Sequence, residues 1–287
     1  MTIVSPFRPC SPAARLRAIA ILLLASLAIT NAASPLDMAD VSVTSSLRQE
    51  FTVHAGDTRS GILTIVNRGA VAASVTITQV DIAFSAVGAV VYEDAGSSAS
   101  SNSAWIHVAA RVEVPAGGQA QVPFTIEVPA DARLHGSYWS VLQIQPEAAS
   151  RVTTEAQAER VTTSVEVIVQ YGVTVLTHVG TPAARTLQFE APTFRHDPAT
   201  GEHHLHVVLH NPGTHVVSTK LWLELYDQGG ALVTRVDAND QRIYPGVSMS
   251  ARLDLGTLGQ QAYQAVVVAD AGGSDVFGVR YSLDTSR

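Results

Sequence analysis

Two stretches of this chain, 144 positions apart, carry the same pattern, and this repeat limits what the chain can fold into. Each is an apolar run that stops at Asn-x-Gly; the first covers residues 62–69 and the second residues 205–213. Another apolar run follows each of them, at 74–77 and at 220–225. A motif order that repeats with turns at matching points predicts two copies of one β-rich domain.

The rest of the sequence has the alternation of β-strands and almost no helix signal. One seven-residue run places four apolar side chains on a single face, namely Val122, Phe124, Ile126 and Val128. Longer strands are predicted over residues 137–144 and 164–176. Strands at intervals of roughly ten residues are typical of antiparallel sandwiches. We therefore expect an all-β fold of two tandem immunoglobulin-like β-sandwich domains, residues 38–179 and 185–284.

The first 32 residues have the features of a signal peptide. Three arginines precede an apolar run at residues 18–29, and small residues before position 33 suit a signal peptidase. The run has about a dozen residues, which is too short to span a bilayer, although an uncleaved anchor is the alternative. Cys10 is the only cysteine, so the mature chain can form no disulfide and has no thiol for catalysis.

The charge of the mature chain argues against nucleic acid as a partner. Removing three signal arginines from 18 Lys and Arg leaves 15 against 25 Asp and Glu, a net charge of −10. Phosphate binding requires a basic surface that this composition does not supply. An exported, acidic chain with no second apolar span is expected in the periplasm, or secreted or at the cell surface, with no transmembrane segment after maturation.

Two tyrosines sit at equivalent points of the repeat. Tyr138 and Tyr263 each follow a Leu-Gly turn and open a late strand. Such a tyrosine can fold back and donate a hydrogen bond to the preceding loop, which pins one sheet to the other. The alternative is that both are ordinary half-buried strand residues.

The two copies differ mainly by polar insertions. The Ser-rich stretch at residues 93–103 occurs only in the first copy, and a second polar stretch covers residues 146–163. Segments of this composition bury little apolar surface. Both are therefore predicted to be mobile excursions from the first sandwich.

Histidine is the one residue type that clusters, with six of the chain's ten within 20 residues: His196, His203, His204, His206, His210 and His215. On an extended strand His204, His206 and His210 share one face, while Leu205 and its alternate neighbours face the core. Imidazoles at this spacing can bind zinc. The alternative, a solvated strand face opposite an apolar stripe, explains the same pattern, and no cofactor is expected.

No enzyme motif is present. The chain lacks a Gly-x-Ser-x-Gly elbow and a Ser-x-x-Lys pair, and Lys220 is its only lysine. Asp and Asn residues at 237–240 and 270–275 suit turns better than calcium loops, which need six or more oxygen ligands. We therefore expect a protein-binding protein and no enzyme.

The long strand that leads into the second copy resembles that of the periplasmic pilus chaperones of the chaperone–usher system. It reads Thr163-Ser164-Val165-Glu166-Val167-Ile168-Val169-Gln170-Tyr171 and follows a polar loop. In that family, two immunoglobulin-like domains present such a strand to an unfinished pilus subunit, which it completes by strand addition. The resemblance implies that Val165, Val167, Val169 and Tyr171 contact an exported protein subunit.

The chain departs from that family at one point of the strand. Pilus chaperones anchor the client's terminal carboxylate with a basic pair that includes a lysine on this strand, and the nearest position here is Glu166. The anchor is therefore not carried over to this chain; Arg48 and Arg111 are basic residues that could supply part of it, but neither matches the motif.

A second resemblance comes from the phrase at residues 114–139, which includes Val-Pro-Ala-Gly-Gly and Gly-Ser-Tyr-Trp. It is similar to the first domain of two-domain cell-wall proteins that bind WxL-type surface proteins and peptidoglycan. The sequence thus favours a periplasmic chaperone-like assembly factor. A structural or adhesive wall-associated module that binds a surface protein or peptidoglycan is the alternative.

Overall fold

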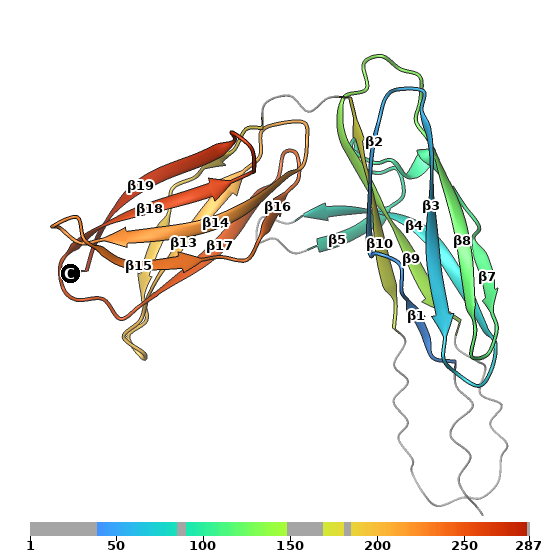
Figure 1. The fold of residues 1–287 in the computed structure, drawn as a ribbon, viewed down its shortest axis with the longest axis horizontal. Coiled ribbons are helices and arrows are strands. Elements are labelled where there is room, and N and C mark those ends of the chain that lie inside the picture. Colours follow the sequence, from blue (N-terminus) through green and yellow to red (C-terminus); the bar gives the residue numbers. More distant parts are fainter. Residues whose placement is uncertain (1–38, 85–89, 148–168, 181–184, 286–287) are drawn as a thin grey trace, which may run out of the picture. The chain divides into compact units, whose positions relative to one another are not determined.

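The computed structural model describes residues 39–84, 90–147, 169–180 and 185–285, and their regular structure is almost entirely β-strand (Figure 1). The short 3-10 helix η2 (Ser103–Trp105) is the exception. The all-β prediction is therefore confirmed. The predicted signal peptide, residues 1–32, lies outside the described residues. Among the described residues, no helix is long and apolar enough to cross a membrane.

The first sandwich consists of two sheets. One has the order β1 (Val41–Val43), β3 (Thr58–Asn67), β8 (Gln119–Glu127) and β6 (Ile106–Val108). The other has the order β2 (Arg48–Val53), β10 (Tyr171–Val179), β9 (Gly136–Pro146), β4 (Ala73–Phe84) and β5 (Val90–Asp94), and β7 (Arg111–Val114) also pairs with β4. The β2–β10 pair is parallel, and the other pairs of this sheet are antiparallel.

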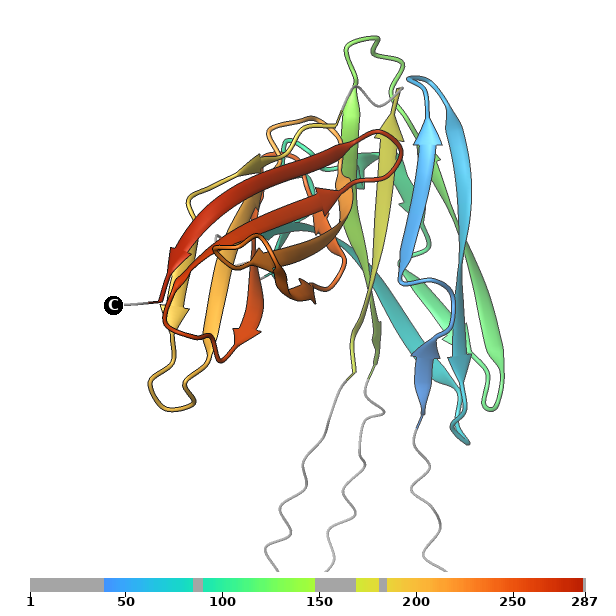
Figure 2. The ribbon, with the colours of Figure 1, turned by 60° about the vertical axis from the view of Figure 1, so that its left-hand side comes forward.

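The second sandwich repeats this architecture (Figure 2). One sheet holds β11 (Gln188–Phe189), β13 (His203–His210) and β12 (Thr193–His196), and β17 (Ser248–Gly256) pairs with β13. The other has the order β15 (Leu232–Asp237), β14 (Val217–Tyr226), β18 (Ala262–Asp270) and β19 (Val276–Asp284), and β16 (Gln241–Ile243) pairs with β14. The predicted limits of the two domains, 38–179 and 185–284, stay a prediction.

Each sandwich has its own apolar core, built from alternate strand positions. The four side chains predicted to share a face of β8 and its continuation are all buried and belong to the first core: Val122, Phe124, Ile126 and Val128. The second core takes Leu205, Val207 and Leu209 from β13. A third, smaller cluster joins Trp139 and Leu176 of the first sandwich to Tyr244 of the second.

The repeated Asn-x-Gly motif is a buried hydrogen-bond clamp. The Asn67 amide nitrogen donates to the carbonyl oxygens of Val71 (2.7 Å) and Val114 (3.2 Å), and its oxygen accepts from the Gly69 amide (2.9 Å). In the second copy, the Asn211 amide nitrogen donates to His215 (2.8 Å) and Ile243 (2.9 Å). Its oxygen accepts from the Gly213 amide at 2.9 Å. A buried asparagine needs partners for all its polar groups, which accounts for the repeat.

The two tyrosines behave differently. Tyr263 is buried and its hydroxyl donates to the Gly259 carbonyl oxygen at 3.1 Å, which is the predicted corner. Tyr138 is half-buried, and its ring packs against Trp105 with the centroids 4.7 Å apart. Tyr138 therefore matches the alternative of a half-buried strand residue, whose ring packs against an aromatic neighbour.

The prediction that residues 93–103 bury nothing is wrong. Asp81 of β4 is fully buried, and its carboxylate accepts hydrogen bonds from the Ser98 amide (2.9 Å) and the Ser101 hydroxyl (2.6 Å). Asn102 is also fully buried. The serines serve as donors for a buried carboxylate, a requirement that composition alone does not reveal. Most of the second polar stretch, from residue 148, lies outside the described residues.

Candidate functional site

The strand β10 is flanked on both sides for only part of its length. It pairs with β9 from Tyr171 to Val179, but with β2 only from Thr174 to Val179. Among the described residues, Tyr171, Gly172 and Val173 therefore have no strand partner on the β2 side. This open edge lies at the end of β10 where the chain enters the strand (Figure 1).

The hydrogen-bonding direction of this open edge follows from its neighbour. The Thr174 amide donates to the Leu47 carbonyl oxygen at 2.9 Å, toward β2. In an antiparallel pair, alternate residues direct their N–H and C=O groups to the same side. The backbone groups of Gly172 therefore point to the open edge, where a further strand would find a donor and an acceptor.

Two of the four predicted contact residues lie in the described part of the chain. Val169, just before β10, is 50% exposed. Tyr171 opens β10 and packs partly against the first core. Both share the parity of the fully buried Val173 and Val175. Val165 and Val167, which extend this parity, lie outside the described residues.

Side chains from distant segments hold β10 in place. The Asn102 amide nitrogen lies 3.1 Å from the Val175 carbonyl oxygen and 2.9 Å from the Thr177 hydroxyl. On the other face, a Cβ added at Gly172 would lie 3.2 Å from Val141 and 3.5 Å from the Tyr92 hydroxyl. Sequence reasoning missed Asn102 and Tyr92, because only strand pairing brings residues 70 or more positions apart together.

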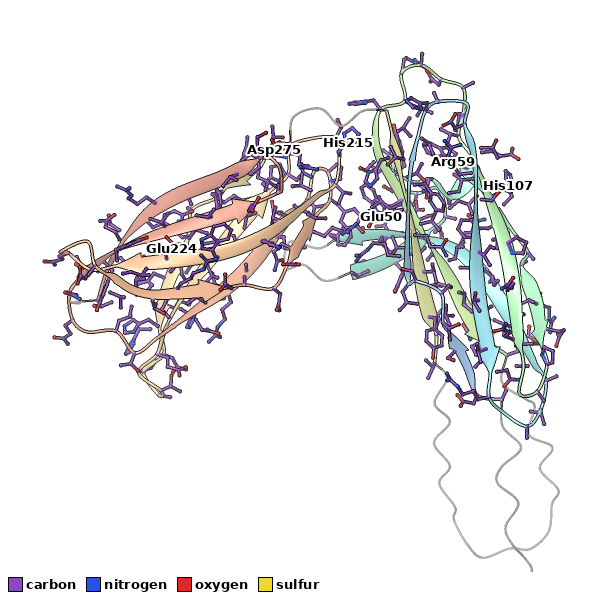
Figure 3. All side chains as sticks on the ribbon, in the orientation of Figure 1. Glu50, Arg59, His107, His215, Glu224 and Asp275 are labelled. Atoms are coloured by element: carbon purple, nitrogen blue, oxygen red, sulfur yellow. The ribbon has the colours of Figure 1, made fainter. Side chains whose placement is uncertain are left out.

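The residues Ser137, His178 and Glu50 adopt the order of a hydrolase triad. The Ser137 hydroxyl is 2.8 Å from His178 Nδ1, and His178 Nε2 is 3.8 Å from a Glu50 carboxylate oxygen (Glu50 is labelled in Figure 3). The Ser137 hydroxyl also accepts a hydrogen bond from the Val216 amide at 2.9 Å. Ser137 is 3% exposed, so the hydroxyl of this triad-like group is buried.

Burial lowers the pKa of His178, and the nearby Glu50 carboxylate opposes this shift. The neutral ring with its hydrogen on Nε2 fits these partners, because Nδ1 then accepts from Ser137 and Nε2–H points to Glu50. Arg242 of β16 also forms an ion pair with Glu50. The Glu50 charge is thus shared between an arginine and a neutral imidazole.

The two arginines that were candidates for a carboxylate anchor differ in their surroundings. Arg111 donates to the Ser74 hydroxyl at 2.7 Å and forms an ion pair with Glu147, so it is already engaged. Arg48 opens β2 and is exposed, opposite Thr174 in the parallel pair. Arg48 is therefore the one at the boundary of the open edge. Glu166 lies outside the described residues.

The predicted face of β13 is present, with His204, His206 and His210 half-buried opposite Leu205, Val207 and Leu209. The rings of His204 and His206 meet edge to face with centroids 5.1 Å apart, whereas His210 Nδ1 lies 3.1 Å from the Ser248 hydroxyl. In the described part of the chain, no three His, Cys, Asp or Glu residues gather as a metal site would require. The geometry therefore brings together two of the three candidate ligands.

No protein-family model matches the chain, and no curated protein matches it. Among solved structures, it is similar to a chain of the chaperone–tip adhesin complex of CFA/I fimbriae, with 11% identity, coverage of 85% of this chain and 98% of that one, and a TM-score of 0.48. The class 5 fimbriae chaperone CfaA is 12% identical, with coverage of 85% of this chain and 98% of that one, and a TM-score of 0.47. The E. coli chaperone DraB is 12% identical, with coverage of 84% of this chain and 96% of that one, and a TM-score of 0.43.

Proposed function

We propose that this chain is an exported, non-enzymatic protein-binding protein of the periplasm, which assists the assembly of a surface fibre or exported subunit. It would do so as a chaperone, by adding the segment that leads into β10, residues 165–171, as a strand to an incomplete sheet of its client. The observation that carries the proposal is the open edge of β10 at Tyr171–Val173, next to the exposed Val169.

The open edge supplies the backbone part of this interaction. Strand addition gains its affinity from main-chain hydrogen bonds, and its specificity from pockets that receive alternate side chains. Gly172 directs an N–H and a C=O to the open edge, so a client strand would find partners there. An unprotected edge is otherwise a risk for aggregation, which supports a role in binding.

The apolar parity of the strand supplies the side-chain part. Val173 and Val175 fill the first core, and Val169 continues their face beyond it. Side chains of one parity point to one side of a strand. If the strand continues through residues 165–168, Val165 and Val167 would extend this face toward the client, as donor residues of an added strand require.

The proposal is tested by replacing Val167 and Val169 together with glutamate. The tagged protein is purified from its own periplasm, and the co-eluting proteins are measured by mass spectrometry. We expect the wild type to recover a small exported subunit near one-to-one. The double variant is expected to recover at least about tenfold less of this subunit, because two charges would be buried in the client.

The control is Gln170→Glu, which adds one such charge at an exposed position of opposite parity. It is expected to keep the client. Unchanged recovery by the double variant with a β-type circular dichroism spectrum overturns the proposal. Recovery of the wild type alone, or with peptidoglycan fragments, favours the wall-associated alternative.

A further inference from the structure

Three histidines meet where the two sandwiches contact each other. His135 lies just before β9 and His178 lies near the end of β10, both in the first sandwich, whereas His215 precedes β14 in the second. The ring centroid of His215 is 4.8 Å from that of His135 and 6.4 Å from that of His178. We call these three residues the interface histidines.

Hydrogen bonds around His215 fix its backbone at this contact. Its own carbonyl oxygen accepts from the Asn211 side chain at 2.8 Å. The Thr214 carbonyl oxygen accepts from the Ser137 amide at 2.8 Å, and the Val216 amide donates to the Ser137 hydroxyl at 2.9 Å. The residues on both sides of His215 are thus bonded to the first sandwich, so its ring stays beside the other interface histidines while these bonds hold.

A proton on the His215 ring is poorly accommodated in this arrangement. The residue is 7% exposed, and its Nε2 atom is buried without a hydrogen-bond partner. Burial lowers the pKa of His215, the two neighbouring imidazoles add to this shift, and the Val179 backbone opposes it. A buried charge without a partner is costly, and a second charged imidazole beside it adds repulsion.

The carboxylate at this contact acts on His178. Glu50 of β2 lies with a carboxylate oxygen 3.8 Å from His178 Nε2, and Arg242 of β16 forms an ion pair with the same carboxylate. Burial lowers the pKa of His178, Glu50 raises it, and Arg242 lowers it. Glu50 and His215 are labelled in Figure 3. Because an arginine already balances this carboxylate, it offers a charged His215 little compensation.

The remainder of the contact is aromatic and keeps its charge state near neutral pH. The Tyr244 ring stacks on Phe84 with the centroids 4.5 Å apart, and its centroid is 4.8 Å from that of Trp139. Burial raises the pKa of Tyr244, and Arg48 and Arg242 oppose this shift. Histidine is the side chain that changes its charge between about pH 5 and 8. The interface histidines are therefore the groups of this contact that respond to pH in that range.

We propose that the interface histidines make the contact between the two sandwiches a pH-sensitive switch. With neutral rings the sandwiches stay docked, and protonation favours the form in which they are separated. The sign follows from linkage: a histidine whose pKa is lower in the docked form holds the contact above about pH 6.5 and weakens it as the pH falls. This inference does not rest on the proposed function, because it involves no client.

The switch is tested by the distance between two spin labels, one on each sandwich, measured by pulsed EPR on the full protein. Cys10→Ser removes the only native cysteine, and Ser60→Cys and Ser250→Cys add labels at exposed strand positions. We expect one narrow distance distribution at pH 8. At pH 5 at least about half of that population should move to other distances and return when the pH is raised again. The same distribution at both pH values overturns the proposal.

Two variants assign the effect to the interface histidines. In the labelled protein, His215→Asn removes the buried titrating ring, and it is expected to keep at least about twofold more of the docked population at pH 5 than its parent. His54→Asn, at an exposed position of the first sandwich, is the matched control and should behave like the parent. Equal loss of the docked population in His215→Asn and in the control overturns the assignment.

A third variant decides the case in which His215→Asn disturbs the contact at every pH. His135→Asn changes an exposed residue that adds repulsion to a charged His215. It is expected to move the midpoint of the transition to lower pH, which a loss of packing alone does not do. An unchanged midpoint in this variant overturns the role of the histidine cluster.

Discussion

The two sandwiches share an internal clamp and differ at their last strand. Asn67 and Asn211 make equivalent buried hydrogen bonds. The last strand of the second sandwich, β19, pairs with β18 over its whole length and lies at the end of its sheet, and its exposed positions are Val276, Gly278, Arg280, Ser282 and Asp284. The last strand of the first, β10, begins beside an exposed valine and leaves three residues open on one side.

This difference separates the requirements of folding from those of binding. Polar and charged residues along an edge discourage strand addition, and three of the five exposed positions of β19 are of this kind. The first sandwich keeps the same scaffold but leaves β10 unprotected at its beginning. The shared pattern therefore reflects what the fold needs, and the departure from it lies where we propose that a partner binds.

The largest effect is expected from breaking the shared clamp. Asn67→Ala and Asn211→Ala each remove the donor for two carbonyl oxygens, in fully buried positions. Each is expected to lower the free energy of unfolding by about 3 kcal/mol, measured by urea denaturation. The control is Asn239→Ala, at an exposed position. A loss below about 1 kcal/mol at either site would contradict the clamp.

A smaller effect should come from a position where the two cores differ. Gly61 lies opposite Phe124 in the β3–β8 pair, whereas Leu205, 144 positions on, lies opposite Leu253. A Cβ at Gly61 would be 2.2 Å from the Phe124 ring. Gly61→Ala is expected to cost about 2 kcal/mol of unfolding free energy through overpacking.

The compensating change sharpens this comparison. Phe124→Leu in the Gly61→Ala background gives the first core a pair of residues closer to each other in size, as in the Leu205–Leu253 pair of the second core. The double variant is expected to be more stable than the sum of the single changes by at least about 1 kcal/mol. Additive costs in a double-mutant cycle would mean that Phe124 does not set the need for glycine.

The smallest effect is a pH dependence of stability that arises from histidines of both sandwiches. Burial lowers the pKa of His215, helped by His135 and His178, and burial also lowers the pKa of His178. His215 is labelled in Figure 3. A histidine whose folded pKa lies below its unfolded value of about 6.5 binds protons more readily when unfolded.

Stability is therefore expected to be constant above about pH 6.5 and to decline as the pH falls through that value toward the lower folded pKa. The check is the free energy of urea unfolding from pH 8 to pH 5. His215→Asn should flatten part of this decline, and His54→Asn, an exposed control, should not. A wild-type curve that rises toward pH 5 would contradict the sign.

Much of the site was visible in the sequence only as a pattern. The alternation around Val169 and Tyr171 predicted a strand over residues 164–176 with an apolar face; in the structure the strand covers Tyr171–Val179, and Val173 and Val175 are buried on one face. The sequence did not reveal that β2 begins only opposite Thr174, because pairing between segments 126 positions apart depends on where each strand bends and ends. Tyr92 and Asn102 reach β10 through the same long-range pairing.

By itself, the sequence determined the class of the fold, the repeat and the faces of the strands, because period-two alternation and Asn-x-Gly turns act over a few neighbouring residues. Only the tertiary structure decided that the serines after Tyr92 satisfy the buried Asp81, that the Ser137 hydroxyl is buried beside His178, and that β10 has an open edge. These features depend on which distant groups are buried together, because burial makes an unpaired polar group costly. They also depend on where neighbouring strands begin and end, because an edge without a neighbour can pair with another strand.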